Sequence, residues 1–126
     1  MGYRVVDVND LSYEERPPKP GEGTRLAADV TTAAGLAQSR AKLWRYPPRS
    51  TGRRHRDHVQ EEVFVVVSGS PAVMLGDPPV RHDAPAGTLV VVEPGTPLKW
   101  FNDGKGDALI FAYGAPAESR AEILES

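Results

Sequence analysis

Short runs of apolar residues, rich in valine and separated by glycine, proline and aspartate, recur along most of the chain. Runs of about four to eight residues bounded by such turn-forming residues are typical of β-strands. A protein with many short strands and turns folds as a sandwich or a barrel. We therefore expect an all-β protein with strands at residues 3–8, 24–30, 39–46, 62–67, 72–75, 88–92, 98–102 and 108–113.

The remaining segments do not fit this strand pattern. Residues 10–23 are polar and contain several prolines, which predicts an irregular arm, and residues 47–57 read as a loop rich in arginine. Small residues around Gly35 indicate a turn. Residues 116–124 place small and apolar side chains at helical spacing, so we expect a short C-terminal helix there.

The bulk properties of the chain narrow the choice of function. The length of 126 residues is the usual size of one domain. With 15 Lys and Arg against 17 Asp and Glu, nothing in the charge suggests a nucleic acid or a membrane surface as partner. The lack of cysteine excludes disulfides, thiolate nucleophiles and cysteine-ligated zinc. Residues 1–10 have no apolar stretch of a secretion signal, so we expect a cytoplasmic protein.

The most informative segment is residues 55–69, which read HRDHVQEEVFVVVSG. Glu62 and Gly69 stand at the spacing found in the first motif of the cupin family, so the segment resembles that motif. The family motif opens with H-x-H before the glutamate. In its longer version the histidine positions fall on His55 and Asp57, and in its shorter version on Arg56 and His58.

The second cupin motif is similar to residues 87–102 of this chain. The family pattern has Gly, then Pro-x-Gly, then His, then Asn, and the spacing is kept here by Gly87, Gly95, Leu98 and Asn102. Two identities differ, because Glu93 replaces the proline and Leu98 replaces the histidine. In the family that histidine is a metal ligand, and a leucine side chain cannot bind a metal ion.

The resemblance extends over residues 40–113 and implies a fold. It implies an antiparallel double-stranded β-helix, the cupin or jelly-roll barrel, as a single domain over residues 1–126. The N-terminal arm and first strands would span residues 1–38, the barrel core 39–113 and the helical tail 114–126.

The resemblance also implies a metal site inside the barrel. Two imidazoles and a carboxylate that point to one side can hold a divalent ion. The candidate ligands are His55, Glu62 and either Asp57 or His58, and the expected cofactor is one weakly bound Zn, Ni, Mn or Fe ion. A barrel without metal is the alternative. Because alternate residues of a strand face the same side, His58 points away from His55 unless the strand bulges.

The same alternation predicts which side chains line the barrel interior. A pocket with aromatic and apolar walls and a few polar groups is typical of a small-molecule site. Plain core packing is the alternative for the aromatic residues. The candidate pocket residues are Trp44, Tyr46, Phe64, Leu98, Trp100 and Asn102.

Three functions remain open at this point. The barrel is a metal-dependent oxygenase, isomerase or lyase, a metal-free protein that binds or senses a small molecule, or a metal-free acid–base catalyst with His55 as the base. The arginines of residues 47–57 are either solvated or form a basic rim that steers an anionic ligand into the barrel.

We also expect a homodimer. Residues 63–67 and 89–92 are apolar without alternation, whereas a strand with one face in water alternates. The N-terminal arm or a second subunit could cover the outer face. Because the family also pairs through this region, we expect the strand at residues 3–8 to add to the sheet edge of a partner.

Overall fold

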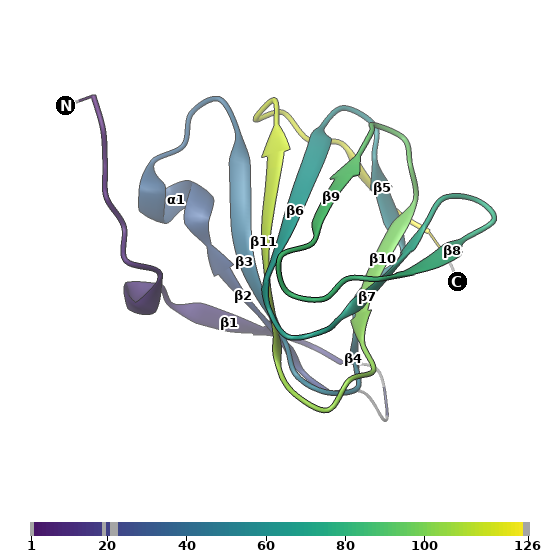
Figure 1. Ribbon diagram of the computed structural model, residues 1–126. Coiled ribbons are helices and arrows are strands. Elements are labelled where there is room, and N and C mark those ends of the chain that lie inside the picture. The colour runs from purple at the N-terminus through teal and green to yellow at the C-terminus, as the bar shows by residue number, and fades with distance from the viewer. Residues whose placement is uncertain (1, 19, 21–22, 125–126) are drawn as a thin grey trace.

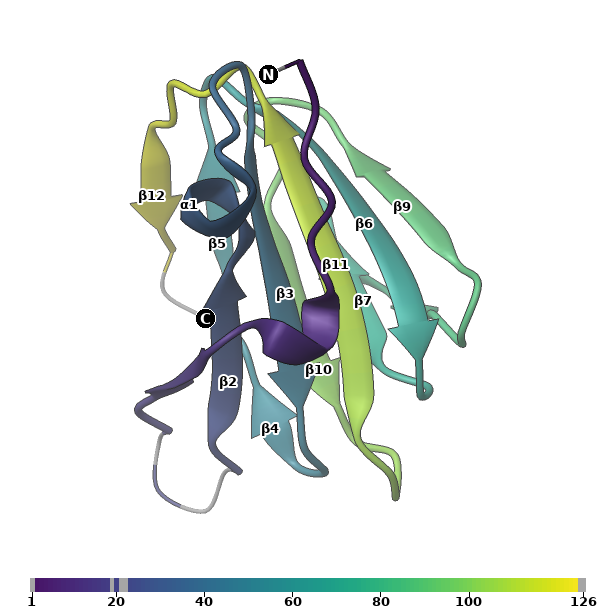
Figure 2. The ribbon, with the colours of Figure 1, turned by 90° about the vertical axis from the view of Figure 1, so that its left-hand side faces the viewer.

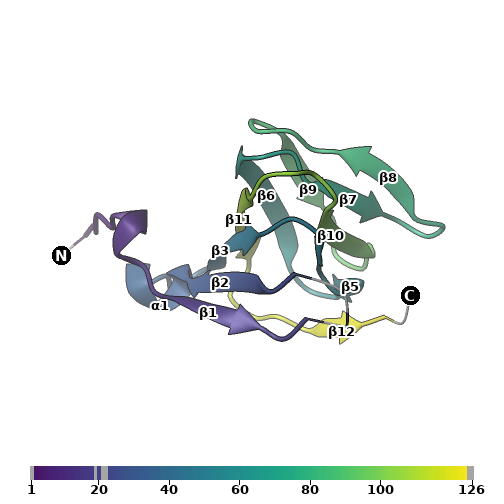
Figure 3. The same ribbon diagram turned by 90° about the horizontal axis from the view of Figure 1, so that it is seen from below.

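Two antiparallel sheets that face each other make up the structure, a computed structural model that describes residues 2–18, 20 and 23–124 (Figure 1). The first sheet has the order β1-β2-β3-β11-β6-β9 and comprises β1 (Tyr13–Arg16), β2 (Arg25–Asp29), β3 (Arg40–Tyr46), β11 (Ala108–Ala115), β6 (Glu61–Ser68) and β9 (Leu89–Val92). The second has the order β12-β5-β10-β7-β8 and comprises β12 (Ala121–Ile123), β5 (His55–Asp57), β10 (Leu98–Asn102), β7 (Ala72–Leu75) and β8 (Val80–Asp83), with β4 (Ser50–Thr51) beside β10. The all-β antiparallel barrel is confirmed, and Figure 3 shows the two sheets enclosing its interior.

Side chains alternate between interior and exterior along the strands that carry the two motifs. Phe64 and Val66 of β6 are buried, and so are Leu98, Trp100 and Asn102 of β10. Each large apolar side chain that is fully buried stabilises the fold by about 1.5–3 kcal/mol relative to an exposed position. The core therefore lies between the two sheets and is built from the positions that the strand periodicity predicts.

Two glycines of the motifs hold turns that need a left-handed backbone. Gly69 has a φ of 84° and Gly95 a φ of 85°, a region that other L-residues rarely adopt. A Cβ atom on Gly69 would also lie 2.7 Å from the Cα of Ala108. The Gly95 N–H donates a hydrogen bond to the Asp57 carbonyl, which ties the two motifs together.

The predicted helix at residues 116–124 is wrong. This segment instead contains β12, which pairs with β5 and closes that edge of the second sheet (Figure 2). A helix of about nine residues is too short to be stable by itself, whereas the free edge of β5 offers backbone hydrogen bonds to any extended neighbour. The sheet edge therefore decides the conformation of the tail.

The predicted strand at residues 3–8 is also wrong. These residues pair with no strand in the part of the chain that the structure describes, and they lead into a 3-10 helix, Val8–Asp10, whose first turn is capped by the Asp7 carboxylate. The segment runs outside the barrel (Figures 1 and 3). A strand needs an edge to pair with, and the local sequence could not show that residues 3–8 lie beside no sheet edge among the described residues.

Several short polar elements were not expected from the sequence. β1 lies in the segment expected to be irregular, β4 and β5 lie in the expected loop, and β8 has no apolar signal because all four of its residues are exposed. The turn expected around Gly35 holds the helix α1 (Val30–Ala34), which ends at Gly35 with a φ of 66°. No helix in the described ranges is long and apolar enough to cross a membrane.

Candidate functional site

A cavity of about 420 Å³ opens between the first sheet and the strands β5, β10 and β12. Its walls include Trp44 and Tyr46 from β3, Phe64 from β6 and Trp100 from β10. The ring centroids of Trp44 and Tyr46 lie 5.9 Å apart, and those of Phe64 and Trp100 lie 5.5 Å apart, both in tilted contact. The structure thus brings together four of the six side chains proposed for the pocket.

Leu98 and Asn102, the other two, are buried beside the cavity but do not line it. Leu98 packs in the apolar core. The Asn102 amide donates hydrogen bonds to the carbonyls of Tyr46 and Gly106, and its oxygen accepts one from the Gly104 N–H. These bonds use the polar atoms of Asn102, so this side chain holds the barrel together and offers nothing to a ligand.

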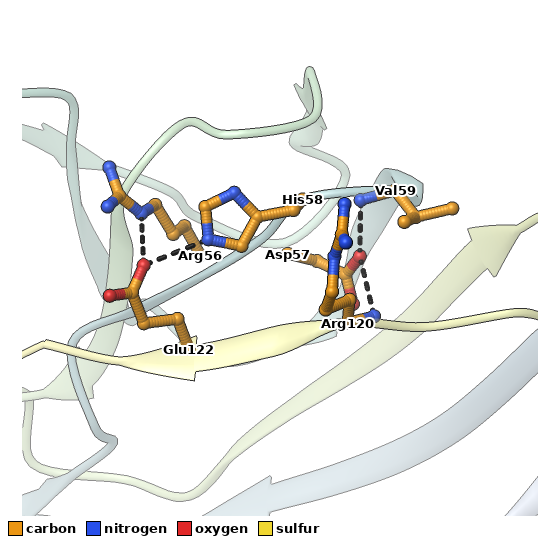
Figure 4. A network of polar contacts seen from close by, with 6 residues as sticks. All are labelled: Arg56, Asp57, His58, Val59, Arg120 and Glu122. Atoms are coloured by element: carbon orange, nitrogen blue, oxygen red, sulfur yellow. Dashed lines mark hydrogen bonds and ion pairs between the residues drawn. The ribbon is translucent and has the colours of Figure 1, made fainter.

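The Asp57 carboxylate lines the cavity but is already occupied by hydrogen bonds. One oxygen accepts from the N–H groups of Val59 and Arg120 at 2.9 and 3.3 Å (Figure 4). The same oxygen accepts from the Gln60 N–H at 2.8 Å, and the other oxygen accepts from the Ser119 hydroxyl at 2.7 Å. Burial raises the pKa of Asp57, but these hydrogen bonds outweigh it and bring the pKa down to about 2. Asp57 therefore fastens the chain before β6 to the segment that leads into β12.

His58 lies away from the cavity. Its Nε2 is 2.9 Å from a carboxylate oxygen of Glu122, and the same oxygen accepts a hydrogen bond from Arg56 at 2.7 Å (Figure 4). Arg56 first, and then His58, lower the pKa of Glu122. Together these three side chains form an exposed polar cluster that joins β12 to β5 on the outside of the barrel.

His55 and Glu62 are the polar motif residues that line the cavity and remain able to bind a ligand or transfer a proton. The His55 Nδ1 lies 2.9 Å from the Arg53 carbonyl, and since a carbonyl only accepts, the proton belongs on Nδ1 and the lone pair on Nε2. Burial, and then the negative charge of Asp57, raise the pKa of Glu62 to about 7. One basic nitrogen and one carboxyl that titrates near neutrality therefore face the interior.

The residues at the motif positions do not fit a bound metal ion. The oxygens of Asp57 are engaged by four donors, His58 points outward, and Leu98 stands where the family motif has a histidine. Within the described residues no group of three or more His, Asp or Glu side chains is placed to hold a metal. His55 and Glu62 alone make a poor donor set for a divalent ion.

A group of cationic side chains was missed by the sequence reasoning. The cavity wall contains five cationic residues but only two carboxylates, those of Asp57 and Glu62. Only one of the five belongs to the arginine-rich loop that was proposed as a basic rim. The alternation of Arg40, Lys42 and Trp44 along one face of β3 was visible in the sequence. The sequence could not show which other charged residues lie near these cations in space. The five are Arg16, Arg25, Arg40, Lys42 and Arg53.

Comparisons with known proteins agree with this geometry. A family model described as "Cupin domain" matches residues 42–113. No curated protein matches the chain. Solved structures match over nearly the whole chain but with low identity, so they bear on the fold alone.

Three of these structures illustrate the range of proteins that share this fold. A protein with a double-stranded β-helix domain from Klebsiella pneumoniae is 19% identical, with 98% of each chain covered and a TM-score of 0.77. A sugar phosphate isomerase from Silicibacter pomeroyi is 19% identical, with 98% of this chain and 83% of that chain covered and a TM-score of 0.82. The polyketide cyclase RemF from Streptomyces resistomycificus is 21% identical, with 98% and 86% covered and a TM-score of 0.78.

Proposed function

Because the chain belongs to the cupin family, we propose that its barrel binds a small organic molecule without a metal ion at its centre. The observation that carries this proposal is the hydrogen bonding of Asp57. A carboxylate that already accepts four hydrogen bonds is a weak metal ligand, because turning it toward a metal ion would leave N–H and O–H donors in the protein unpaired. The aromatic cavity beside it is of a size and character suited to a small molecule.

The metal content of the protein tests this proposal directly. We expect untagged protein, purified without added metal and measured by elemental analysis, to contain far less than one metal ion per chain. Zinc, nickel and manganese should leave the melting temperature unchanged. One tightly bound ion per chain would overturn the proposal.

A second candidate function is metal-independent proton transfer, and the observation that favours it is Glu62. A carboxyl with a pKa of about 7 can both take up and release a proton at neutral pH, and the lone pair on His55 Nε2 supplies a second proton acceptor in the same cavity. An isomerisation or a cyclisation would need groups of this kind.

Exchange of substrate protons separates catalysis from binding. Candidate sugar phosphates and hydroxy acids incubated with the protein in D₂O should acquire deuterium, detected by NMR, only if the protein transfers protons. Glu62→Gln should abolish the exchange while binding persists. Binding with no exchange for any compound that binds would leave the protein a binding or sensing barrel.

We further propose that the protein is a homodimer. The outer face of β6 and β9 exposes Val67, Leu89 and Val91 by 52–60%, and Tyr3 and Val5 of the N-terminal segment are exposed by 81% and 91%. Apolar segments of this kind are usually covered in solution. Light scattering should give the mass of a dimer at micromolar concentration, and deletion of residues 2–7 should shift it to a monomer. A monomer mass for the whole chain would refute the dimer.

A further inference from the structure

We propose that the cavity recognises its ligand through an acidic group, a carboxylate or a phosphate, held by Arg16, Arg25 and Lys42 beside the Trp44 ring. This inference rests on the proposed function, because it assigns the chemical class of the molecule that the barrel binds. It adds a binding subsite away from the two sequence motifs. The subsite belongs to β1, β2 and β3, most of which lie before the segment that the family model matches.

Three cations surround one indole ring. The Arg25 guanidinium carbon lies 5.1 Å from the Trp44 ring centroid, the Lys42 nitrogen 5.7 Å and the Arg16 guanidinium carbon 5.9 Å. These distances are in the range of cation–π attraction. Arg25 also lies 5.9 Å from the Tyr46 ring, between the two aromatic side chains. The aromatic rings thus hold the cations at the cavity wall.

The strand register forces like charges together. Arg16 and Arg25 stand directly opposite each other in the β1–β2 ladder, an arrangement that costs stability when both side chains are charged. Burial, followed by the positive charges of Arg16 and Arg40, lowers the pKa of Lys42, while Asp29 acts in the opposite direction. The fold therefore concentrates positive charge at a place where it repels itself.

The nearby carboxylates neutralise little of this charge. Glu14 pairs with Arg16 at 3.4 Å, but 79% of its side chain is exposed to solvent. The two oxygens of Asp29 accept hydrogen bonds from the backbone and hydroxyl of Thr32 at the start of α1. Among the described residues, neither Arg25 nor Lys42 forms an ion pair. An anionic ligand would supply the missing negative charge.

A second, independent feature of the same cavity requires an acceptor. Trp100 is 4% exposed and lines the cavity, and its indole Nε1 is buried without a hydrogen-bond partner among the described residues. A buried N–H left unpaired destabilises the fold. A ligand oxygen would satisfy this donor. The proposed ligand places its acidic group beside Trp44, in a cavity whose wall also holds this unpaired donor.

Intrinsic fluorescence can test the inference, because both tryptophans of the chain line the cavity. The probes are matched pairs that differ in charge: benzoate against benzyl alcohol, and glucose 6-phosphate against glucose, with inorganic phosphate alone. We expect at least one anion to bind about tenfold more tightly than its neutral partner and to lose affinity as salt rises. The pair that shows the difference identifies the acidic group as a carboxylate or a phosphate.

Matched variants locate the subsite. Arg25→Gln and Lys42→Gln should each weaken binding of the anion about tenfold and leave binding of the neutral partner unchanged. Arg45→Gln is the control, because Arg45 lies next to Trp44 on β3 but does not line the cavity and pairs with Asp107 at 3.7 Å. Circular dichroism checks that each variant is folded. Because two positions are tested, the result does not depend on the correct folding of a single variant.

Each outcome decides a separate claim. If neutral compounds bind as tightly as their anionic partners, or if Arg45→Gln weakens the anion as much as Lys42→Gln does, the anionic subsite is wrong and the binding barrel stands. If no probe changes the fluorescence of the unaltered protein, the anionic subsite is overturned as well. Stoichiometric metal in the protein would overturn the proposed function and leave the charge preference as an independent result.

Discussion

Polar groups on different walls of the cavity are satisfied by the protein to opposite extents. On the wall that carries the first motif, Asp57 is buried and its oxygens accept four hydrogen bonds from the protein itself. On the wall formed by β1, β2 and β3, Arg25 and Lys42 have no ion pair among the described residues, and Trp100 Nε1 on β10 has no acceptor among them. A polar group that the fold satisfies stabilises the fold, whereas one that it leaves unsatisfied is free to bind a ligand.

The largest expected effect is the loss of the Asp57 carboxylate. Asp57→Ala should lower the free energy of unfolding by about 3 kcal/mol, because it leaves buried donors of two segments unpaired. Urea denaturation at pH 7 measures this change. Ser119→Ala, which removes one of the donors, is the matched control and should cost clearly less. Equal stability of Asp57→Ala and the unaltered protein would show that the carboxylate does not fasten the fold.

The pH dependence of the same carboxylate provides a second readout. The folded pKa of Asp57, about 2, lies below its ordinary value of 3.8, so the stabilisation is present above about pH 4 and is lost as the pH falls through 2. The loss amounts to about 2.5 kcal/mol. In Asp57→Asn this acid-dependent loss should disappear.

Glu62 should make stability depend on pH in the opposite direction. Its folded pKa of about 7 lies above the ordinary 4.5, so stability is greatest below pH 4.5 and is lost as the pH rises through 7. At pH 8 Glu62→Gln should therefore be more stable than the unaltered protein by about 1–2 kcal/mol, a value reduced for the partial exposure of the side chain. Thermal unfolding at pH 4 and pH 8 checks this, and the gain should vanish at pH 4. A variant less stable at pH 8 would contradict the raised pKa.

Leu98→His tests whether the two motifs can bind a metal ion once the missing histidine is supplied. Leu98 stands directly opposite His55 in the pairing of β10 with β5, so an imidazole at position 98 would lie beside His55. We expect this variant to bind zinc or nickel about tenfold more tightly than the unaltered protein by calorimetry, and His55→Ala in the same background to abolish the gain. Lys99→His, one position along the strand, is the control. No gain at position 98 would mean that the motif is not a degenerate metal site.

The smallest effect is expected at His58. Because His58 contacts Glu122 outside the cavity, His58→Ala should change neither ligand binding nor metal content and should alter stability only slightly. Fluorescence titration with the best anionic probe checks the first point. A loss of binding in this variant would place His58 in the site after all.

The barrel and its inward-facing positions could be predicted from the sequence, because successive side chains of any strand, β6 and β10 included, point to opposite faces. The edges of the sheets could not be predicted in the same way. β12 forms because β5 offers an unpaired edge, and β8 forms because β7 does, although neither segment has a strand-like pattern. Such strands are defined by their neighbours in space.

The candidate site was predictable to the same limited degree. Trp44 and Trp100 were placed at the cavity by periodicity, but the role of Asp57 depends on Ser119 and Arg120, more than sixty residues along the chain. The cationic group depends likewise on the register of β1 against β2, which brings Arg16 opposite Arg25. Charge in a sequence becomes informative only when pairing shows whether it is neutralised.

The pairing of β12 with β5 also fixes when the pocket can come into existence during synthesis. Ala121 and Ile123 form part of the cavity wall, and Ser119 and Arg120 hold Asp57 in place. The binding site of a nascent chain therefore stays incomplete until residues 119–123 have emerged from the ribosome. A ligand that needs the complete cavity wall therefore cannot guide the folding of the strands that come before β12.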